Sequence, residues 1–291
     1  MIPLMPFLVD TMIPMDGPYL NNIVHEWGVV VFQESGAHMA GGLGDGMSFY
    51  DQSDIDACAE APVVWIHGEP FTGAFTVNLP EGQNFTFLYP EPWDLSDIQA
   101  TWRIEADGSS GHMNEELVPV FGPFQAASVW WEAVPSLDLY FPDEDKTANY
   151  IYYECTVGSD FCDPFLEWNS GGSPSLSEGF PEEALYFIDG RAMTFSPPAR
   201  GLIDWSFSGE GLTEDQIQEI LCGWAGGMLK SSEIEALWET WKPYWRQGSW
   251  VVFPIPEEHH LDISRITLSI DRTRTVEYER LFLGAVRLDP R

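Results

Sequence analysis

Short runs of β-type residues recur along most of the chain, and several alternate between apolar and polar positions. Phe75, Val77 and Leu79 share one face of an extended segment, and Ile266 and Leu268 repeat this pattern near the C-terminus. Successive side chains of a strand point to opposite faces, so a period of two predicts strands with one buried face. The predicted strands are 28–33, 62–66, 75–79, 85–89, 101–106, 128–134, 150–154, 185–188, 203–207, 249–255, 265–270 and 276–288. They are numerous enough for two packed sheets.

A turn separates two of these runs. Pro80 suits the second position of a β-turn, and Gly82 accepts the backbone angles that the turn then requires. We therefore expect residues 75–89 to form a β-hairpin.

Residues 213–246 depart from the β pattern and show helical spacing. Thr213 with Gln216, and Ser232 with Glu235, each match the capping box that begins a helix. Apolar residues follow at the spacing i, i+3, i+4, i+7, namely Ile217, Ile220, Leu221 and Trp224, and then Ile234, Leu237, Trp238 and Trp241. Gly226-Gly227 is expected to end the first helix and Pro243 to limit the second. The pattern predicts a helical hairpin that packs on the sheet, and a partner-binding groove is the alternative.

Together these patterns predict a mostly β fold, a jelly-roll-like β-sandwich with a C-terminal α-helical hairpin packed on it. We expect one domain over residues 23–291, including the hairpin at 213–246. Residues 1–22 contain four prolines and predict an extended N-terminal arm. The first residues lack a basic region, so they do not match a signal peptide as they stand, and a leader was either removed or never present.

Charge excludes one class of partner. The chain has 46 acidic and 13 basic residues and a formal net charge of −33, which would repel a nucleic-acid backbone. Surface scaling for this mass puts one net charge on each ~380 Å², a spacing of about 19 Å that exceeds the screening length in saline. Such diffuse charge favours solubility in a salty or extracellular setting, and cation binding is the alternative.

Hydropathy and cysteine content bear on the compartment. No apolar run approaches the ~18 residues of a membrane-spanning helix. Cys155 and Cys162 lie seven residues apart in a turn-rich stretch, where a disulfide is expected, and Cys58 can pair with Cys222. The even number of cysteines suits an oxidising, extracytoplasmic compartment, whether periplasm, cell surface or medium. Four reduced structural cysteines are the alternative.

Two histidines flank predicted strands and suggest chemistry. His25 and Glu26 come just before the strand at 28–33, and His67 comes just after the strand at 62–66. If these strands are neighbours, the side chains could converge at one end of a sheet. They could then hold a divalent cation such as zinc or copper, or act as an acid–base pair. Alternatively, each histidine caps a strand or bonds a loop carbonyl.

A second metal candidate is the acidic cluster Asp51, Asp54 and Asp56, whose oxygens suit calcium. The cluster lacks the spacing of an EF-hand loop, and a solvated loop is the alternative. A nucleotide cofactor is not expected, because no phosphate loop is present and Gly42-Leu43-Gly44 lacks the flanking strand and helix of a dinucleotide site.

Aromatic residues suggest a third kind of site. Trp93, Trp130 and Trp168 fall outside clean alternation, and exposed tryptophans in a β-sandwich can stack on sugar rings. They are candidates for binding a glycan, although burial in the core is the ordinary role of such residues.

A family resemblance rests on several of these segments. The stretch His25-Glu26-Trp27-Gly28, the strand at 61–66, the turn at 79–82 and the late region from Gly211 to Pro254 resemble a set of uncharacterised bacterial proteins of planctomycete and environmental type. The similarity covers most of the chain, but relatives tend to have Arg-Gly where this chain has Glu154-Cys155. The resemblance implies an exported β-rich protein and supplies no activity.

Three functional classes follow and stay open. The first is an exported binding module for a glycan or cell-surface polymer. The second is a metal-dependent enzyme, a hydrolase or oxidoreductase, that uses the histidines and Glu26. The third is a structural or self-assembling surface protein that uses the N-terminal arm. The sequence does not specify the oligomeric state.

Overall fold

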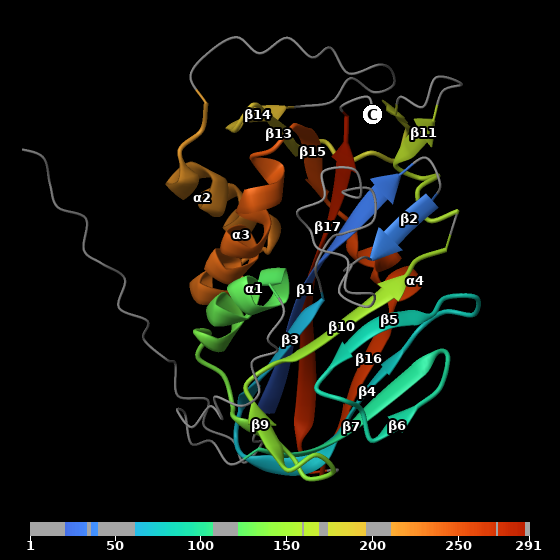
Figure 1. Cartoon of the computed structure of the whole chain (residues 1–291), viewed down its shortest axis with the longest axis vertical. Helices are drawn as coiled ribbons and strands as arrows, with labels where there is room; N and C mark the ends of the chain where they lie inside the picture. The colour runs from blue at the N-terminus through green and yellow to red at the C-terminus, as the bar shows by residue number, and fades with distance from the viewer. Residues whose placement is uncertain are drawn as a thin grey trace, which may run out of the picture.

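The fold is built mainly from β-strands, with helices gathered on one side (Figure 1). The computed structural model describes residues 21–33, 36–39, 62–106, 122–158, 160–168, 174–195, 211–271 and 273–288. The segments at 1–20, 40–61 and 196–210 lie outside this description, which therefore leaves out the strand predicted at 203–207 and nearly all of the predicted N-terminal arm.

The larger sheet is mixed and has nine strands. In spatial order they are β14 (Arg191–Phe195), β13 (Ala184–Ile188), β15 (Ser249–Pro254), β17 (Thr275–Arg287), β1 (Asn21–Gln33), β2 (Gly36–Met39), β10 (Ile151–Thr156) and β3 (Val63–Gly68), with β5 (Phe85–Tyr89) beside β10. The two longest strands, β1 and β17, run parallel through its centre, as Figure 1 shows in blue and red. The first half of β1 also pairs with β3, antiparallel.

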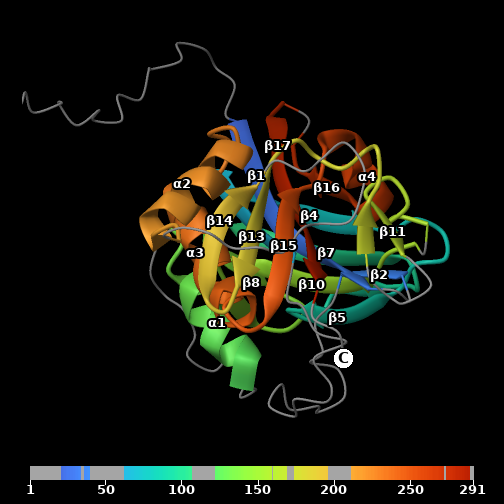
Figure 2. The same ribbon diagram turned by 90° about the horizontal axis from the view of Figure 1, so that it is seen from above.

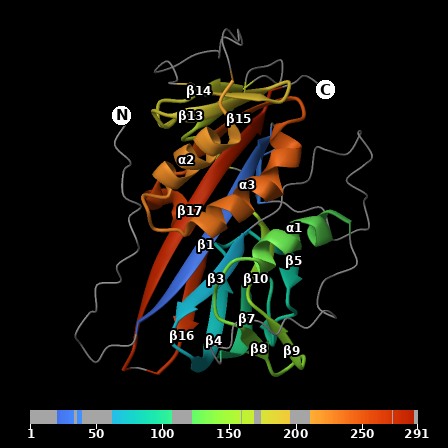
Figure 3. The same ribbon diagram turned by 90° about the vertical axis from the view of Figure 1, so that its left-hand side faces the viewer.

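The smaller sheet is antiparallel and lies toward the lower end of the molecule in Figure 3. Its strands are β16 (Arg265–Ser269), β4 (Phe71–Asn78), β7 (Gln99–Ala106), β8 (Leu139–Phe141) and β9 (Lys146–Ala148), with β6 (Asp94–Leu95) beside β7. A separate pair is formed by β11 (Leu166–Trp168) and β12 (Pro174–Leu176).

Helices cover one face of the larger sheet. They are α1 (Gly122–Glu132), α2 (Glu214–Trp224) and α3 (Ser231–Trp245), and Figures 2 and 3 show them side by side across the sheet. A short 3₁₀ turn, η3 (Glu257–His259), and a single helical turn, α4 (His260–Ile263), lie elsewhere, just before β16.

The central strand β1 is buried on both faces, and its alternation divides the core in two. Val30 and Phe32 belong to an apolar cluster that draws residues from both sheets, including Phe75 and Trp102. Trp27, Val29 and Val31 instead belong to a cluster that the helices complete. The structure is therefore mostly β with two apolar layers, and the jelly-roll-like sandwich and the single domain over residues 23–291 stay predictions.

The helical hairpin is confirmed, with one shift in its second helix. Thr213 caps α2 in a complete capping box with Gln216, as its sequence indicates. The second helix begins two residues earlier than expected, with Lys230 as its cap residue in place of Ser232, so its third position is Glu233 and not Glu235. Pro243 does not end α3, which continues to Trp245.

The hairpin predicted for residues 75–89 is wrong, although its turn forms. Gly82 has a φ of +88°, and the amide of Gln83 donates to the carbonyl of Pro80 at 3.2 Å. However, β4 pairs with β16 and β7, whereas β5 pairs with β10 in the other sheet. The turn therefore passes the chain from one sheet to the other.

The strand predicted for 128–134 is also wrong, because most of it belongs to α1. Ser128 and Trp131 are buried while Val129 and Trp130 are exposed, which is the spacing of a helix lying on a surface. A short window rich in β-type residues cannot reveal that period.

The expected disulfide between Cys155 and Cys162 is absent, and both residues carry thiols. Cys155 is held inside β10 opposite Phe85, and Cys162 starts a turn in which its carbonyl accepts from Phe165 and Leu166. Both sulfurs pack in the apolar cluster as small hydrophobic groups. Cys222 is likewise a thiol, and Cys58, its expected partner, lies outside the described residues.

Among the described residues, no helix combines the length and the apolar character that a transmembrane span requires.

Candidate metal centre

The two histidines predicted to converge lie next to each other on the larger sheet. Their strands, β1 and β3, are antiparallel neighbours, and the register places His67 opposite Ile23, two residues before His25. Both side chains face the helices, and their ring centroids lie 4.5 Å apart. The two strands are therefore neighbours, as convergence of the histidines requires. Both histidines lie within their strands, however, and not just outside the strand ends as the sequence indicated.

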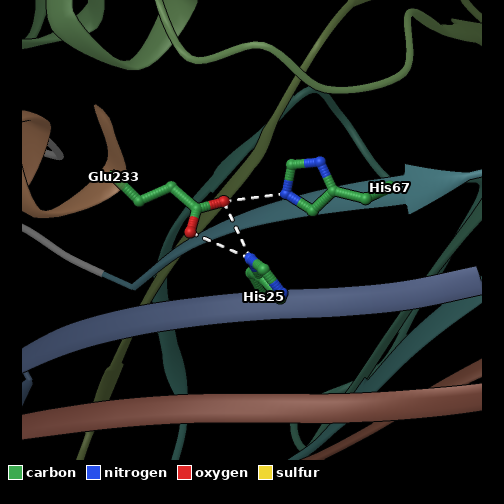
Figure 4. Close-up of side chains that lie close together, drawn as sticks. All are labelled: His25, His67 and Glu233. Atoms are coloured by element: carbon green, nitrogen blue, oxygen red, sulfur yellow. Dashed lines mark hydrogen bonds and ion pairs between the residues drawn. The ribbon is translucent and has the colours of Figure 1, made fainter. Parts of the chain in front are cut away.

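A third group, the carboxylate of Glu233, comes from the first turn of α3 and completes the cluster (Figure 4). Nδ1 of His25 lies 2.9 Å from each carboxylate oxygen, and Nε2 of His67 lies 2.7 Å from Oε1. Oε2 also accepts from the backbone amide of Lys230 at 2.7 Å. One carboxylate therefore caps the helix and joins it to two strands of the sheet.

The cluster is removed from solvent. The side chain of Glu233 is fully buried, and those of His25 and His67 expose 5% and 9%. Burial alone would raise the pKa of Glu233, but hydrogen bonds from the two histidines outweigh it and lower the pKa to about 2. Burial lowers the pKa of His67, and the bond to Glu233 opposes this only in part. The centre therefore holds a carboxylate anion beside a histidine that resists protonation.

Charged residues stand behind each histidine. The carboxylate of Glu279 lies 3.4 Å from Nε2 of His25, and the register pairs these two residues across β1 and β17. The ammonium of Lys230 lies 2.8 Å from Nδ1 of His67 and also donates to the carbonyl of Pro135 at 3.0 Å. Burial lowers the pKa of Lys230, and Glu233 partly offsets this.

His25, His67 and Glu233 could hold a metal ion, because one ligand atom from each lies within 4.8 Å of the others. Imidazole nitrogen suits zinc, copper, iron and nickel, whereas calcium prefers a shell of oxygens. Around a tetrahedral zinc ion such atoms are about 3.3 Å apart. The distances from the two histidine nitrogens to the carboxylate, 2.7–2.9 Å, would need to widen by about half an ångström.

Glu26 does not join this cluster, because it follows His25 on the strand and so faces the opposite side of the sheet. Its carboxylate is buried, pairs with Arg280 and accepts from the hydroxyl of Tyr153 at 2.6 Å. Arg280 and Tyr153 also contact Ser264. Glu26 therefore belongs to a separate buried polar network on the face of the larger sheet opposite the helices.

The other predicted site residues lie apart from the centre or outside the description. Asp51, Asp54 and Asp56 fall outside the described residues. Trp93 is 48% exposed with the guanidinium of Arg103 3.6 Å from its ring centroid, and Trp130 is 37% exposed on α1. Trp168 packs partly buried on the core. The elements that carry the three tryptophans, near β6, in α1 and in β11, lie in separate parts of Figure 1.

Sequence reasoning missed Glu233, Lys230 and Glu279. A signal for Glu233 was present, since a glutamate three residues after a helix cap is expected to turn back toward the cap. Ser232 offered a more usual cap residue than Lys230, and this choice moved the expected glutamate to position 235. No local pattern connects Glu233 with His25, 208 residues away.

The resemblance to exported bacterial proteins stays a prediction. Comparison of the chain with protein-family models, with curated proteins and with solved structures finds no significant match in any of the three.

Proposed function

We propose that this protein binds one divalent transition-metal ion, zinc in the first instance, through Nδ1 of His25, Nε2 of His67 and the carboxylate of Glu233. The observation that supports this most is the convergence of three buried ligand atoms from β1, β3 and α3. Two imidazoles and a carboxylate are a donor set that zinc commonly takes in proteins.

The number of ligands that the described part of the chain supplies, three, supports a catalytic centre over a structural one. Structural zinc sites are closed by four protein ligands, whereas hydrolytic zinc sites have three and leave one position for water. Glu279 stands behind the ring of His25 and so orients that ligand instead of adding a fourth. A metal-dependent hydrolase is therefore the activity that we propose for the centre.

Zinc binding by the metal-free protein tests the proposal. We expect one zinc ion per chain by elemental analysis after dialysis, with the ion raising the melting temperature. Glu233→Gln, His25→Ala and His67→Ala should each abolish stoichiometric binding. The two histidine variants keep the Glu233 cap of α3, so they remain informative if Glu233→Gln fails to fold.

Matched controls are available on α3 itself and on a separate element. Glu235→Gln changes an exposed carboxylate on α3, and His259→Ala removes a histidine remote from the centre. Both variants should bind zinc as the wild type does. A wild-type protein that retains no zinc, or a Glu233→Gln variant that retains it fully, would contradict the proposal.

A glycan-binding module on an exported protein is our second proposal, and exposed Trp93 supports it best. Arg103 covers one face of that indole, so only the other face is offered to a sugar ring. Trp93→Ala should remove retention on an immobilised polysaccharide column, while Trp168→Ala should not. The assembly role is a third candidate, which depends on the predicted N-terminal arm, residues 1–22.

A further inference from the structure

The two histidines of the centre differ in the group that stands behind each ring. Glu279, a hydrogen-bond acceptor, lies near Nε2 of His25. Lys230 lies 2.8 Å from Nδ1 of His67, and an ammonium group can only donate. Metal-binding histidines usually donate their second ring nitrogen to a carboxylate, a carbonyl or water. His25 has an acceptor near its second nitrogen, as in this usual arrangement, whereas His67 has a donor there.

The contact with Lys230 determines which nitrogen of His67 carries the proton. Nδ1 must accept from the ammonium, so the single proton of the neutral ring resides on Nε2. That nitrogen points at Glu233 and donates to Oε1 at 2.7 Å. Nε2 is also the atom that faces the proposed ion, and a metal needs its lone pair.

Metal binding would therefore reverse the pattern at His67. With Nε2 coordinated, the proton of the neutral ring has to lie on Nδ1, where it would face the donor of Lys230. The side chain of Lys230 can leave, since the residue is exposed and already bonds the carbonyl of Pro135.

We propose that Lys230 acts as a latch on the metal centre: its ammonium keeps the proton of His67 on Nε2, and an ion enters only when that ammonium withdraws from Nδ1. This inference rests on the proposed metal site and adds a means of controlling it. The latch uses only the side chain of Lys230, because the cap of α3 depends on its backbone amide.

Substitution of Lys230 separates the latch from the site. Lys230→Met keeps the backbone cap and removes the donor, so zinc affinity, measured by competition with a chromophoric chelator, should rise about tenfold. Lys230→Arg keeps a charged donor and should stay near the wild type. Lys242→Met is the matched control, since this lysine of α3 binds Glu214 and Glu239 away from the centre, and it should leave zinc affinity unchanged.

Nitrogen-15 NMR of the imidazole rings provides a second readout. Metal-free wild type should show the Nε2–H form of His67, and zinc-loaded protein the Nδ1–H form. Zinc bound by wild type with equal affinity in Lys230→Met, or an Nδ1–H form in the metal-free protein, would overturn the latch alone. If neither wild type nor Lys230→Met binds zinc, the metal site and the latch fail together.

Discussion

Adjacent residues of β1 and β17 have separate roles because the two strands are paired in register. His25 lies opposite Glu279 and Glu26 opposite Arg280. Alternation directs the first pair to the face of the sheet that the helices cover and the second pair to the opposite face. Two charged clusters are thereby built back to back, and each is completed by a residue distant in sequence, Glu233 for one and Tyr153 for the other.

The inner network gives a test at the residue scale. Arg280→Met would leave the carboxylate of Glu26 buried and without its cation, so we expect the free energy of unfolding in urea to fall by about 3–5 kcal/mol. Arg265→Met, at an exposed position of β16, should change it by less than about 0.5 kcal/mol. Equal effects of the two substitutions would rule out a structural role for the buried pair.

His260 predicts a loss of stability in mild acid. Burial lowers its pKa from 6.5 to about 4, although its ring bonds the carbonyl of Ile255. Because the folded pKa lies below the unfolded value, the unfolded chain binds the proton first, and stability falls as pH drops from 6.5 toward 4. Protonation of this residue should lower the free energy of unfolding by about 2 kcal/mol between pH 7 and pH 5.

The measurement is urea unfolding of wild type and His260→Gln at both pH values. The glutamine amide can still donate to Ile255 but does not titrate, so the variant should lose less stability on acidification. The pKa of His67 is also lowered, so its protonation destabilises the fold in the same way. The variant should therefore keep part of the decrease in the free energy of unfolding on acidification. Identical slopes for the two proteins would contradict the assignment to His260.

At the scale of elements, the starts of α2 and α3 show how far a local pattern can be trusted. The hydroxyl of Thr213 accepts from the amide of Gln216 at 3.3 Å, and the side chain of Gln216 returns to the amide of Thr213 at 2.9 Å. The first capping box was therefore predicted correctly. In the second helix the cap residue is Lys230. Glu233 forms hydrogen bonds with two histidines that are distant in sequence, and a local sequence pattern cannot predict such contacts.

Paired substitutions test this difference. Thr213→Ala should lower the free energy of unfolding by about 1 kcal/mol, because an amide at the start of α2 loses its acceptor. Ser232→Ala, at the position where the sequence indicated the second cap, should cost less than about 0.5 kcal/mol, since Ser232 lies inside the first turn of α3. A larger loss at Ser232 than at Thr213 would contradict the cap assignment.

For the molecule as a whole, acidity is the dominant electrostatic property. A net charge of −33 acts against any compact state through self-repulsion, which dissolved salt screens. Several described cations pair with nearby acids; Lys242 and Arg246, for example, both contact Glu214. Such exposed ion pairs add little to the free energy of unfolding, so they cannot offset charge repulsion that is spread over the surface.

We therefore expect the melting temperature to rise by several degrees between 10 and 500 mM sodium chloride, as screening shortens the range of the repulsion. Sucrose at matched osmolality serves as the control for solvent effects that do not involve charge. A melting temperature that stays flat across this range of salt would show that repulsion does not limit stability.

The sequence by itself determined the properties that local periodicity encodes. These are the β-rich character, the amphipathic helices α2 and α3, and the association of His25 and His67 with two β-type runs, which in the structure extend far enough to include both histidines. Tertiary structure alone decided which strands pair, so β4 and β5 separate into two sheets despite the turn that joins them. It also placed both Cys155 and Cys162 in the core as thiols, and it selected Glu233 from 46 acidic residues. The physical reason is that a repeat of two or 3.6 residues defines a buried face, whereas contacts across that face depend on the packing of segments far apart in the chain.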